Sequence, residues 1–388
     1  MANRIMLNQT SYHGAGAIQE LPAEVKSRGL KKALICCGPT LLRHGVIARV
    51  TDVLDAAGLS YEIFSDIKPN PTIANVTDGV AAFKAAGADY LIAIGGGSPM
   101  DTSKAIGIII NNPEFADVRS LEGVADTKKP CVPIIAIPTT AGTAAEVTIN
   151  YVITDVEKKR KFVCVDPHDM PIVAIVDPEM MSSMPAGLTA STGMDALTHA
   201  IEAALSKNAN PLTDKDAYWA MQAIVQNLPR AVANGQDEAA RTMMAYAENV
   251  AGMAFSNAGL GMVHAMAHAL GGHYNLPHGV CNAVLLPYVL AFNSRSPVCR
   301  ERFMTIAAAM GLQGTFTPDT AAPAVIQFVR RLSAGVGIPA NLAQLNKVDP
   351  ADFAELAELA LHDTCMSTNQ ITPTRDEVVA VYTAAFRG

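Results

Sequence analysis

The sequence has no long hydrophobic run. None of its 388 residues belongs to a stretch of about 20 uncharged apolar residues, so no segment is expected to span a bilayer. It also has no Lys/Arg-dense segment, and 29 basic against 36 acidic residues give a net charge of −7. Nucleic-acid binding is not expected, because it requires a basic footprint. The N-terminal residues contain no apolar run of signal-peptide length, so a cytoplasmic protein is expected.

Paired cysteine motifs are absent as well. The seven cysteines are an odd, scattered set with no Cys-x-x-Cys pair, and most stand in apolar surroundings such as ALICC and FVCV. This pattern is typical of reduced, buried thiols and again favours the cytoplasm.

Charged residues are few, at 17%, whereas 50% of residues are hydrophobic and the mean hydropathy is +0.21. Disorder is excluded, because it needs low hydrophobicity and high net charge. At about 150 residues per domain, the length indicates two domains or three.

The first part of the chain alternates β-rich runs with helical patterns. Strands are expected at 31–37 and 60–65, within 89–99, where the strand enters a glycine turn, and within 132–140, where it runs into a loop; the helices between them include one over 41–58. Strands that alternate with helices predict a doubly wound, mainly parallel, Rossmann-like sheet, because a parallel pair needs a helical crossover. Runs without polar alternation, such as YLIAI, indicate strands buried on both faces.

The pattern changes near residue 185. From Ala186 onward the sequence is rich in Ala, Met and Leu at 3.6-residue spacing, which predicts an all-α domain. We therefore expect an α/β domain over residues 1–184 and a helical domain over residues 185–388.

A glycine turn, Gly95-Gly96-Gly97-Ser98, follows one expected strand and precedes a helix. Residues without Cβ let backbone N–H groups approach a phosphate, and a helix N-terminus favours negative charge. A second loop of small and hydroxyl residues, 138–143, ends another strand. Both loops suit a dinucleotide at the carboxyl edge of the sheet, although either one could simply be a turn or a helix cap.

Histidines concentrate in the second half. His264 and His268 are four residues apart, as are Asp195 and His199, so each pair shares a helix face. Carboxylate and imidazole groups on packed helices can form a metal site. His278, at an expected helix start, can complete it. His273 follows Gly271-Gly272, where we expect a helix to end, and is predicted to be exposed or to pack against a loop. The spacing alone leaves open which histidines bind.

Four segments together resemble the iron-containing (group III) alcohol dehydrogenase family: GGGSPMDTSKA, PTTAGTAAEVT, DPEMMSSMPAGLTASTGMDALTHAIE and GMVHAMAHALGGHYNLPHG. The likeness covers nearly the whole chain and is weakest around 310–350. It implies an architecture like that of dehydroquinate synthase. The segments ADYLIAIGGGSP and NNPEFADVRSLEG are most similar to members that interconvert lactaldehyde and 1,2-propanediol.

The resemblance also implies site residues. It places a divalent metal, Fe²⁺ or alternatively Zn²⁺, on Asp195, His199, His264 and His278. It places His268 beside the metal as a catalytic residue and not as a ligand. With the two loops described above, the implied cofactor-binding residues are Gly38, Asn70, Gly96, Gly97, Ser98, Thr139, Thr140, Thr143, Asn150 and Lys161. The implied substrate pocket is lined by Asn150, Phe255 and Cys365, and an inert core thiol is an equal interpretation of Cys365.

One position departs from the family pattern. NAD-using relatives carry an aspartate at the end of the strand that corresponds to residues 31–37 here. Its carboxylate binds the adenine-ribose hydroxyl and repels a 2′-phosphate. Here the residue is Gly38, with Arg43 close in sequence. We therefore expect NAD(H) as cofactor with NADP(H) also usable.

The resemblance implies a metal-dependent oxidoreductase that acts on small aldehydes and primary alcohols, working as a homodimer. A 1,3-propanediol or general short-chain alcohol dehydrogenase is the alternative within the family. Outside it, a metal-dependent lyase or hydrolase on a related scaffold is another hypothesis. The zinc-protease motif needs Glu directly after the first histidine, and Ala265 stands there. A non-catalytic nucleotide- or metal-binding protein is a further hypothesis.

Overall fold

A computed structural model describes residues 2–388, and the chain divides into two compact units. One consists of residues 6–158 and 162–183. The other consists of residues 184–388 with Lys159–Lys161 and residues 2–5. The division at 183–184 lies beside the boundary expected from composition. A single cut does not describe it fully, because Lys159–Lys161 group with the C-terminal unit.

The first unit is built on a parallel sheet of six strands in the order β1-β8-β5-β4-β2-β3. Its strands are β1 (Thr10–His13), β2 (Lys32–Cys36), β3 (Ser60–Phe64), β4 (Tyr90–Gly95), β5 (Ile134–Pro138) and β8 (Val173–Val176). A separate two-stranded sheet pairs β6 (Asn150–Asp155) with β7 (Arg160–Val165). The predicted doubly wound parallel sheet is confirmed.

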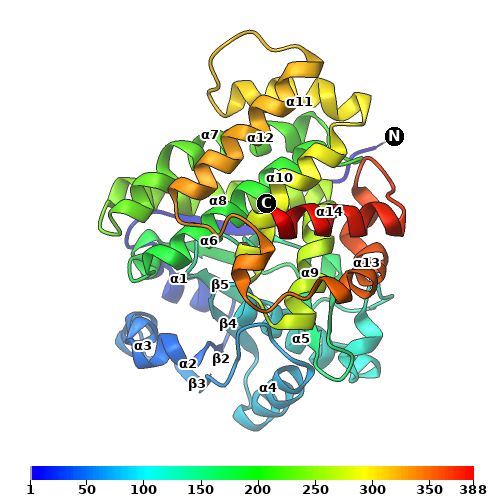
Figure 1. Cartoon of the computed structure of the whole chain (residues 1–388). Coiled ribbons are helices and arrows are strands. Elements are labelled where there is room, and N and C mark those ends of the chain that lie inside the picture. The colour runs from blue at the N-terminus through cyan, green and yellow to red at the C-terminus, as the bar shows by residue number, and fades with distance from the viewer. Residues whose placement is uncertain (1) are drawn as a thin grey trace. The chain divides into compact units, whose positions relative to one another are not determined.

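Helices pack on both faces of this sheet, as Figure 1 shows for α1 and α3 on one side and α4 and α5 on the other. The helices of this unit are α1 (Leu21–Ser27), α2 (Pro39–Arg43), α3 (Val46–Ala56), α4 (Ile73–Ala86) and α5 (Gly97–Asn111). On β2, Ala33 and Ile35 belong to the core shared with α1 and α3, whereas Leu34 and Cys36 belong to the core shared with α4 and α5. Burial on both faces explains the uninterrupted apolar runs.

The helix expected over 41–58 was wrong as one element. The structure has α2 and α3 instead, separated by His44 and Gly45, because Gly45 has a φ of 72° that ends one helix and begins the next. Apolar periodicity continues across the break, so spacing alone could not locate it.

The second unit is helical, as predicted. Its helices are α6 (Ala186–Leu205), α7 (Pro211–Ala233), α8 (Glu238–Ala258), α9 (Met262–Tyr274), α10 (His278–Asn293), α11 (Pro297–Ala309), α12 (Pro318–Gly335), α13 (Phe353–His362) and α14 (Arg375–Arg387). In α6 nearly every residue from Thr189 to Leu205 is buried. Such a helix forms the centre of a helical domain. Within residues 2–388, no helix has the length and apolar character needed to cross a bilayer.

The helix end expected at Gly271-Gly272 was wrong. Helix α9 continues through Gly271 and Gly272 to Tyr274, and Asn275, with a φ of 52°, then reverses the chain. His273 lies in the last turn, with its Nε2 atom 3.4 Å from Asp352 Oδ2. Two consecutive glycines weaken a helix but do not end this one, in which all residues from Met262 to Leu270 are buried.

Candidate active site

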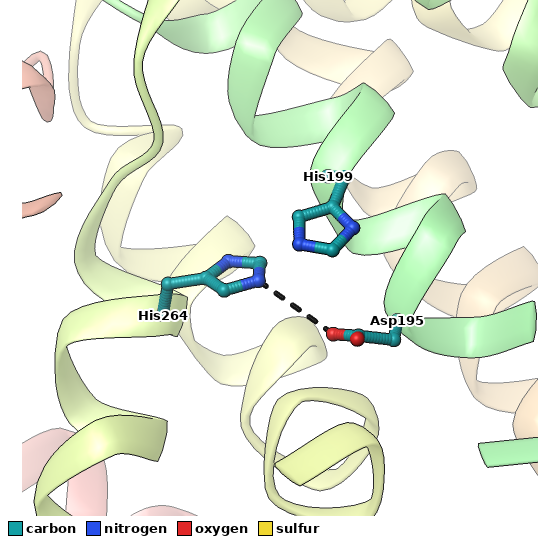
Figure 2. Close-up of side chains that lie close together, drawn as sticks. All are labelled: Asp195, His199 and His264. Carbon is teal, nitrogen blue, oxygen red and sulfur yellow. Dashed lines mark ion pairs between the residues drawn. The ribbon is translucent and has the colours of Figure 1, made fainter. Parts of the chain in front are cut away.

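Helix α6 presents an acid and an imidazole on one buried face. Asp195 and His199 are one turn apart, and only 2% and 4% of their surfaces are exposed. Helix α9 brings His264 opposite them, with its Nε2 atom 3.6 Å from Asp195 Oδ1 (Figure 2). One ligand atom from each of the three residues lies within 4.8 Å of the others.

Helix α10 adds the fourth residue that the sequence suggested. It begins at His278, directly after Pro277, and His278 Nε2 lies 3.7 Å from Asp195 Oδ1. Ligand atoms on a tetrahedral metal with bonds of about 2.1 Å are about 3.4 Å apart. The separations of Asp195 Oδ1 from His264 and His278 are close to this spacing. Asp195, His199 and His264 thus form one group, which His278 adjoins through Asp195, and this donor set fits a divalent ion such as Fe²⁺ or Zn²⁺.

The electrostatics of these residues suit ligands. Burial raises the pKa of a carboxyl, but the imidazoles of His278, His199 and His264 outweigh it and hold the pKa of Asp195 well below its usual range. Asp195 is thus an anion at neutral pH. Burial lowers the pKa of His278 well below its ordinary 6.5. The neutral ring has a lone pair available for coordination.

His264 differs from His278 in its protonation. Burial alone lowers its pKa, but hydrogen bonds to Asp195 and Glu202 reverse the effect and raise it to about 9. A metal ion at this site therefore has to displace a proton from His264 at neutral pH, which couples metal binding to pH.

Sequence reasoning missed Asn282, which lies one turn after His278 on α10. Its buried Nδ2 donates to Asp195 Oδ1 at 2.6 Å and lies 3.1 Å from the Nε2 atoms of both His264 and His278. An amide NH₂ group has only two hydrogens, so it cannot donate to all three atoms at once, and the shortest contact, to Asp195, takes one of them. The spacing of four from His278 was the available signal.

Sequence reasoning also missed Glu202, although it stands in the quoted run DALTHAIE. It follows Asp195 by seven residues on the same face of α6 and is 4% exposed. Its Oε2 atom lies 2.6 Å from His264 Nδ1. The imidazole therefore has a carboxylate on one nitrogen and Asp195 near the other.

His268 belongs to a second group. Its Nδ1 atom lies 2.9 Å from Asp363 Oδ2, and ligand atoms of His268, Asp363 and Cys365 lie within 4.8 Å of one another. The His268 ring stacks on His278, with centroids 5.2 Å apart and planes at 14°. Its place is thus next to the converging ligands but outside their group. Asp363 was not expected from the sequence.

Two side chains expected in the substrate pocket have defined surroundings. Phe255, on α8, stacks on His199 with ring centroids 4.2 Å apart. Cys365 donates its backbone N–H to Asp363 at 2.8 Å. Burial and the Asp363 charge raise the pKa of the Cys365 thiol well above its ordinary value. This thiol is neutral, so it is not an activated nucleophile.

In the first unit, the two cofactor loops lie against each other at the carboxyl ends of neighbouring strands β4 and β5. A Cβ on Gly96 would lie 2.8 Å from Thr140 Oγ1, and a Cβ on Gly97 would lie 3.3 Å from the Thr143 methyl group. Side chains at these positions would displace the hydroxyl loop. The structure therefore brings together the glycine turn and the loop containing Thr139, Thr140 and Thr143.

These loops carry polar groups that a ligand could satisfy. Helix α5 begins at Gly97 with Gly96 as its N-cap and no side-chain cap, so its first N–H groups are available to an anion. Thr140 Oγ1 is buried and has no hydrogen-bond partner among the described residues. Buried polar atoms are normally paired, so this hydroxyl fits a bound ligand such as a pyrophosphate.

Buried Lys104 supports the same region. Its Nζ donates to Thr148 O at 2.6 Å and Asn150 O at 2.9 Å. This ammonium group, only 1% exposed, fixes the backbone that leads to Asn150 at the start of β6. Asn150 belongs to the first unit, whereas Phe255 and Cys365, the other two expected substrate contacts, belong to the second.

The remaining residues that were expected to bind the cofactor are spread over both units. Gly38 caps α2 immediately after β2, and Asn70 has a φ of 56° in the loop before α4. Strand order reverses between β2 and β4, so Gly38 and the glycine turn flank the switch point where open α/β sheets bind ligands. Lys161 groups with the helical unit, where its charge lowers the pKa of His278.

Family models match both halves of the chain. The iron-containing alcohol dehydrogenase model matches residues 8–178, and the C-terminal model of the Fe-containing alcohol dehydrogenase family matches residues 189–386. The chain belongs to the iron-containing alcohol dehydrogenase family. It is accordingly an oxidoreductase of the alcohol dehydrogenase type, and the resemblance seen in its motifs is confirmed.

Relatives in this family align over the full length. A lactaldehyde reductase of Escherichia coli strain K12 is 53% identical and covers 100% of both chains. A 1,3-propanediol dehydrogenase of Klebsiella pneumoniae is 43% identical and covers 98% of both. Among solved structures, a 1,3-propanediol oxidoreductase has a TM-score of 0.95 at 42% identity, with 100% of both chains covered. An alcohol dehydrogenase from Oenococcus oeni has a TM-score of 0.94 at 39% identity, covering 99% of this chain and 100% of its own.

Proposed function

We propose that this protein interconverts small aldehydes and primary alcohols with a nicotinamide cofactor, and that lactaldehyde and 1,2-propanediol are its substrate pair. The observation that carries the proposal is the convergence of Asp195 with three histidines. The full-length identity of 53% to a lactaldehyde reductase supports the substrate.

Asp195, His199, His264 and His278 are the residues that would hold the metal, with Fe²⁺ as the ion and Zn²⁺ as the alternative. When bound, such an ion supplies Lewis acidity toward an aldehyde or alcohol oxygen. Asp195 is the single anion among these four residues. With a divalent ion bound, the site would therefore keep a net positive charge. Phe255, stacked on His199, shields one side of the site from water.

His268 is the proposed proton donor and acceptor. Its Nδ1 atom is held by Asp363, which leaves Nε2 to exchange a proton with the substrate oxygen, directly or through water. The reaction transfers hydride between nicotinamide C4 and the carbonyl carbon. Asp363 orients the ring.

The cofactor would be held in the first unit by the glycine turn and the hydroxyl loop. The uncapped start of α5 and the orphaned Thr140 hydroxyl support this assignment. Asn70, Asn150 and Lys161 are further proposed contacts; Asn150, with Phe255 and Cys365, is also proposed to contact the substrate.

A comparison of aldehydes tests the activity. Metal-loaded enzyme is mixed with NADH and one of lactaldehyde, 3-hydroxypropionaldehyde, acetaldehyde or butyraldehyde, and absorbance is followed at 340 nm. We expect the highest kcat/KM with lactaldehyde. A preference for 3-hydroxypropionaldehyde would favour the 1,3-propanediol alternative, which the Klebsiella relative supports. No oxidation of NADH with any aldehyde would contradict the oxidoreductase assignment of this site and favour a lyase.

Cofactor choice gives a separate prediction. Gly38 neither binds a ribose hydroxyl nor repels a 2′-phosphate, so we expect the NADH and NADPH kcat/KM values to differ by less than about a hundredfold. Gly38→Asp should raise the preference for NADH by at least about tenfold, through repulsion of the phosphate. The substitution fits locally: φ is −88°, and the nearest atom to a new Cβ is Ile67 O at 3.4 Å. An unchanged ratio in Gly38→Asp would place the ribose elsewhere.

We also propose a cytoplasmic homodimer. All seven cysteines are free, as expected in a reducing compartment. Strand β1 lies at the edge of the sheet and offers an unpaired backbone, while Ile5 and Leu7 nearby in sequence are exposed. Light scattering coupled to size-exclusion chromatography should give twice the chain mass of 40.8 kDa; a monomer mass would refute it.

A further inference from the structure

Glu202 connects the two helices that carry Asp195, His199 and His264. From α6 its Oε1 atom accepts the backbone N–H of Val263 at 2.7 Å, and its Oε2 atom lies 2.6 Å from His264 Nδ1. The carboxylate is 4% exposed and the imidazole 1%. Both oxygens are therefore committed to the first turn of α9, in a position that water hardly reaches.

The first contact supplies a cap that α9 itself lacks. Its N-cap residue is Gly261, which has no side chain to accept the first N–H groups. The approach is close, because a Cβ on Gly261 would lie 2.8 Å from Glu202 Oε1. Asn369 accepts the neighbouring N–H of Met262 at 3.3 Å, so two side chains from elsewhere in the fold cap this helix.

The second contact determines which ring nitrogen of His264 carries hydrogen. A carboxylate can only accept, so Nδ1 must be protonated. At the other side of the ring, Nε2 lies 3.6 Å from Asp195 Oδ1 and 3.1 Å from Asn282 Nδ2. In the neutral ring, Glu202 therefore leaves the lone pair on Nε2, on the side of Asp195.

We propose that Glu202 is the positioning residue of the metal site: it holds His264 in the Nδ1–H tautomer and in the ring orientation that a metal ion requires. The inference rests on the proposed function, in which His264 is a ligand. Carboxylates that hold ligand histidines in this way commonly change metal affinity by about 10- to 100-fold when removed.

Glu202→Gln tests this directly, because an amide has only one accepting atom. If its oxygen faces Val263 N–H, its NH₂ group faces His264 Nδ1 and favours the Nε2–H tautomer, which cannot coordinate through Nε2. If the amide is reversed, two donors meet at Val263. We expect Zn²⁺ and Co²⁺ affinity, measured by competition with a chromophoric chelator, to fall by about 10- to 100-fold.

The tautomer itself is a second readout that needs no metal. In metal-free protein labelled with ¹⁵N-histidine, NMR distinguishes Nδ1–H from Nε2–H rings, and a His264→Gln variant assigns the signal. We expect the wild type to be Nδ1–H when its ring is neutral and Glu202→Gln to gain Nε2–H. Glu202→Asp, shorter by one methylene, keeps the charge but cannot reach both partners, and we expect a smaller loss of metal affinity.

Asn369→Ala is the matched control. It removes the other acceptor at the start of α9 and leaves His264 with its partners. We expect it to lower the melting temperature while metal affinity stays within about twofold of wild type. An equal loss of affinity in Asn369→Ala would mean that capping alone matters, which overturns the proposal.

Two further outcomes would also overturn the proposal. Wild-type affinity in both Glu202→Gln and Glu202→Asp, or an unchanged tautomer in Glu202→Gln, overturns the role of Glu202. Failure of the wild type to bind Zn²⁺, Co²⁺ or Fe²⁺ overturns the proposed function instead, and the positioning role toward a ligand falls with it.

Discussion

His264 and His268 are one turn apart on α9, yet their different surroundings favour different roles. His264 has Glu202 on Nδ1 and Asp195 near Nε2. His268 has Asp363 on Nδ1 and lies outside the converging ligand group. An i, i+4 pair shares a helix face, but neighbouring elements decide what each ring contacts.

Removing each imidazole should therefore have distinct effects. We expect His264→Ala to lose bound metal and activity while the fold remains intact. His268→Ala should retain metal but lose about 10²- to 10⁴-fold in kcat, the usual contribution of general acid–base catalysis. Metal analysis of the purified variants and steady-state kinetics separate the two. Full turnover with bound metal in His264→Ala would show that the ligand assignment is wrong.

Protons and metal should compete at His264. Its pKa in the folded, metal-free protein is raised from 6.5 to about 9, so the ring is protonated at neutral pH. Metal affinity should therefore rise by up to about tenfold per pH unit toward pH 9 and then level off. The protonated ring stabilises the metal-free fold below pH 6.5, and this stabilisation is lost as pH rises from 6.5 to 9. Chelator competition across this range measures the first trend. A flat profile would contradict it.

At the scale of elements, the site depends on how closely α10 packs against α6. Gly279, next to His278, makes this approach possible: a Cβ there would lie 2.3 Å from Ser191 O and 3.4 Å from Asp195 Cβ. Ser191 O is a backbone atom of α6, so it cannot move aside as the end of a flexible side chain could. The glycine thus sets the distance between two helices that supply ligands.

Gly279→Ala should force the helices apart. We expect a loss of about 1–3 kcal/mol in the free energy of unfolding from overpacking, together with weaker metal binding because His278 moves relative to Asp195. Gly187→Ala, in the first turns of α6 with no atom within 4 Å of the new Cβ, is the control and should be neutral or slightly stabilising. Denaturant melts and metal titration measure both effects. Equal behaviour of the two variants would refute the packing argument.

For the whole molecule, the proposed metal and cofactor sites draw mainly on different units. The four proposed metal ligands all belong to the helical unit, whereas the glycine turn and the hydroxyl loop belong to the unit with the parallel sheet. A ligand that binds only the folded state stabilises the part of the chain that contains its site. Unfolding of this chain need not be a single two-state transition.

Metal removal should therefore act unevenly. With free metal at about 100 times its Kd, we expect about 2.7 kcal/mol of stabilisation, lost on chelation. Hydrogen exchange should show the loss in α6, α9 and α10, with the strands β4 and β5 little affected. Equal loss of protection in both units would show that the metal site does not belong to the helical unit alone. Calorimetry with and without chelator gives the total effect.

The sequence by itself determined the class of both halves, because apolar runs of strand length and 3.6-residue periodicity are local properties of the chain. The spacings Asp195–His199 and His264–His268 likewise placed side chains on common helix faces. It could not locate the break at Gly45 or the continuation of α9 through Gly271 and Gly272, since these depend on a backbone dihedral and on burial. Family resemblance, not spacing, separated His268 from the ligands.

Tertiary structure alone decided the partners. Glu202, Asn282 and Asp363 contact histidines that are 62, 18 or 4, and 95 residues away in the chain. Apart from the four-residue spacing of His278 and Asn282, no local pattern encodes such separations. A carboxylate or amide next to a histidine in space selects its tautomer and its charge, and only the packing of α6, α9, α10 and the segment after α13 brings these groups within hydrogen-bonding range.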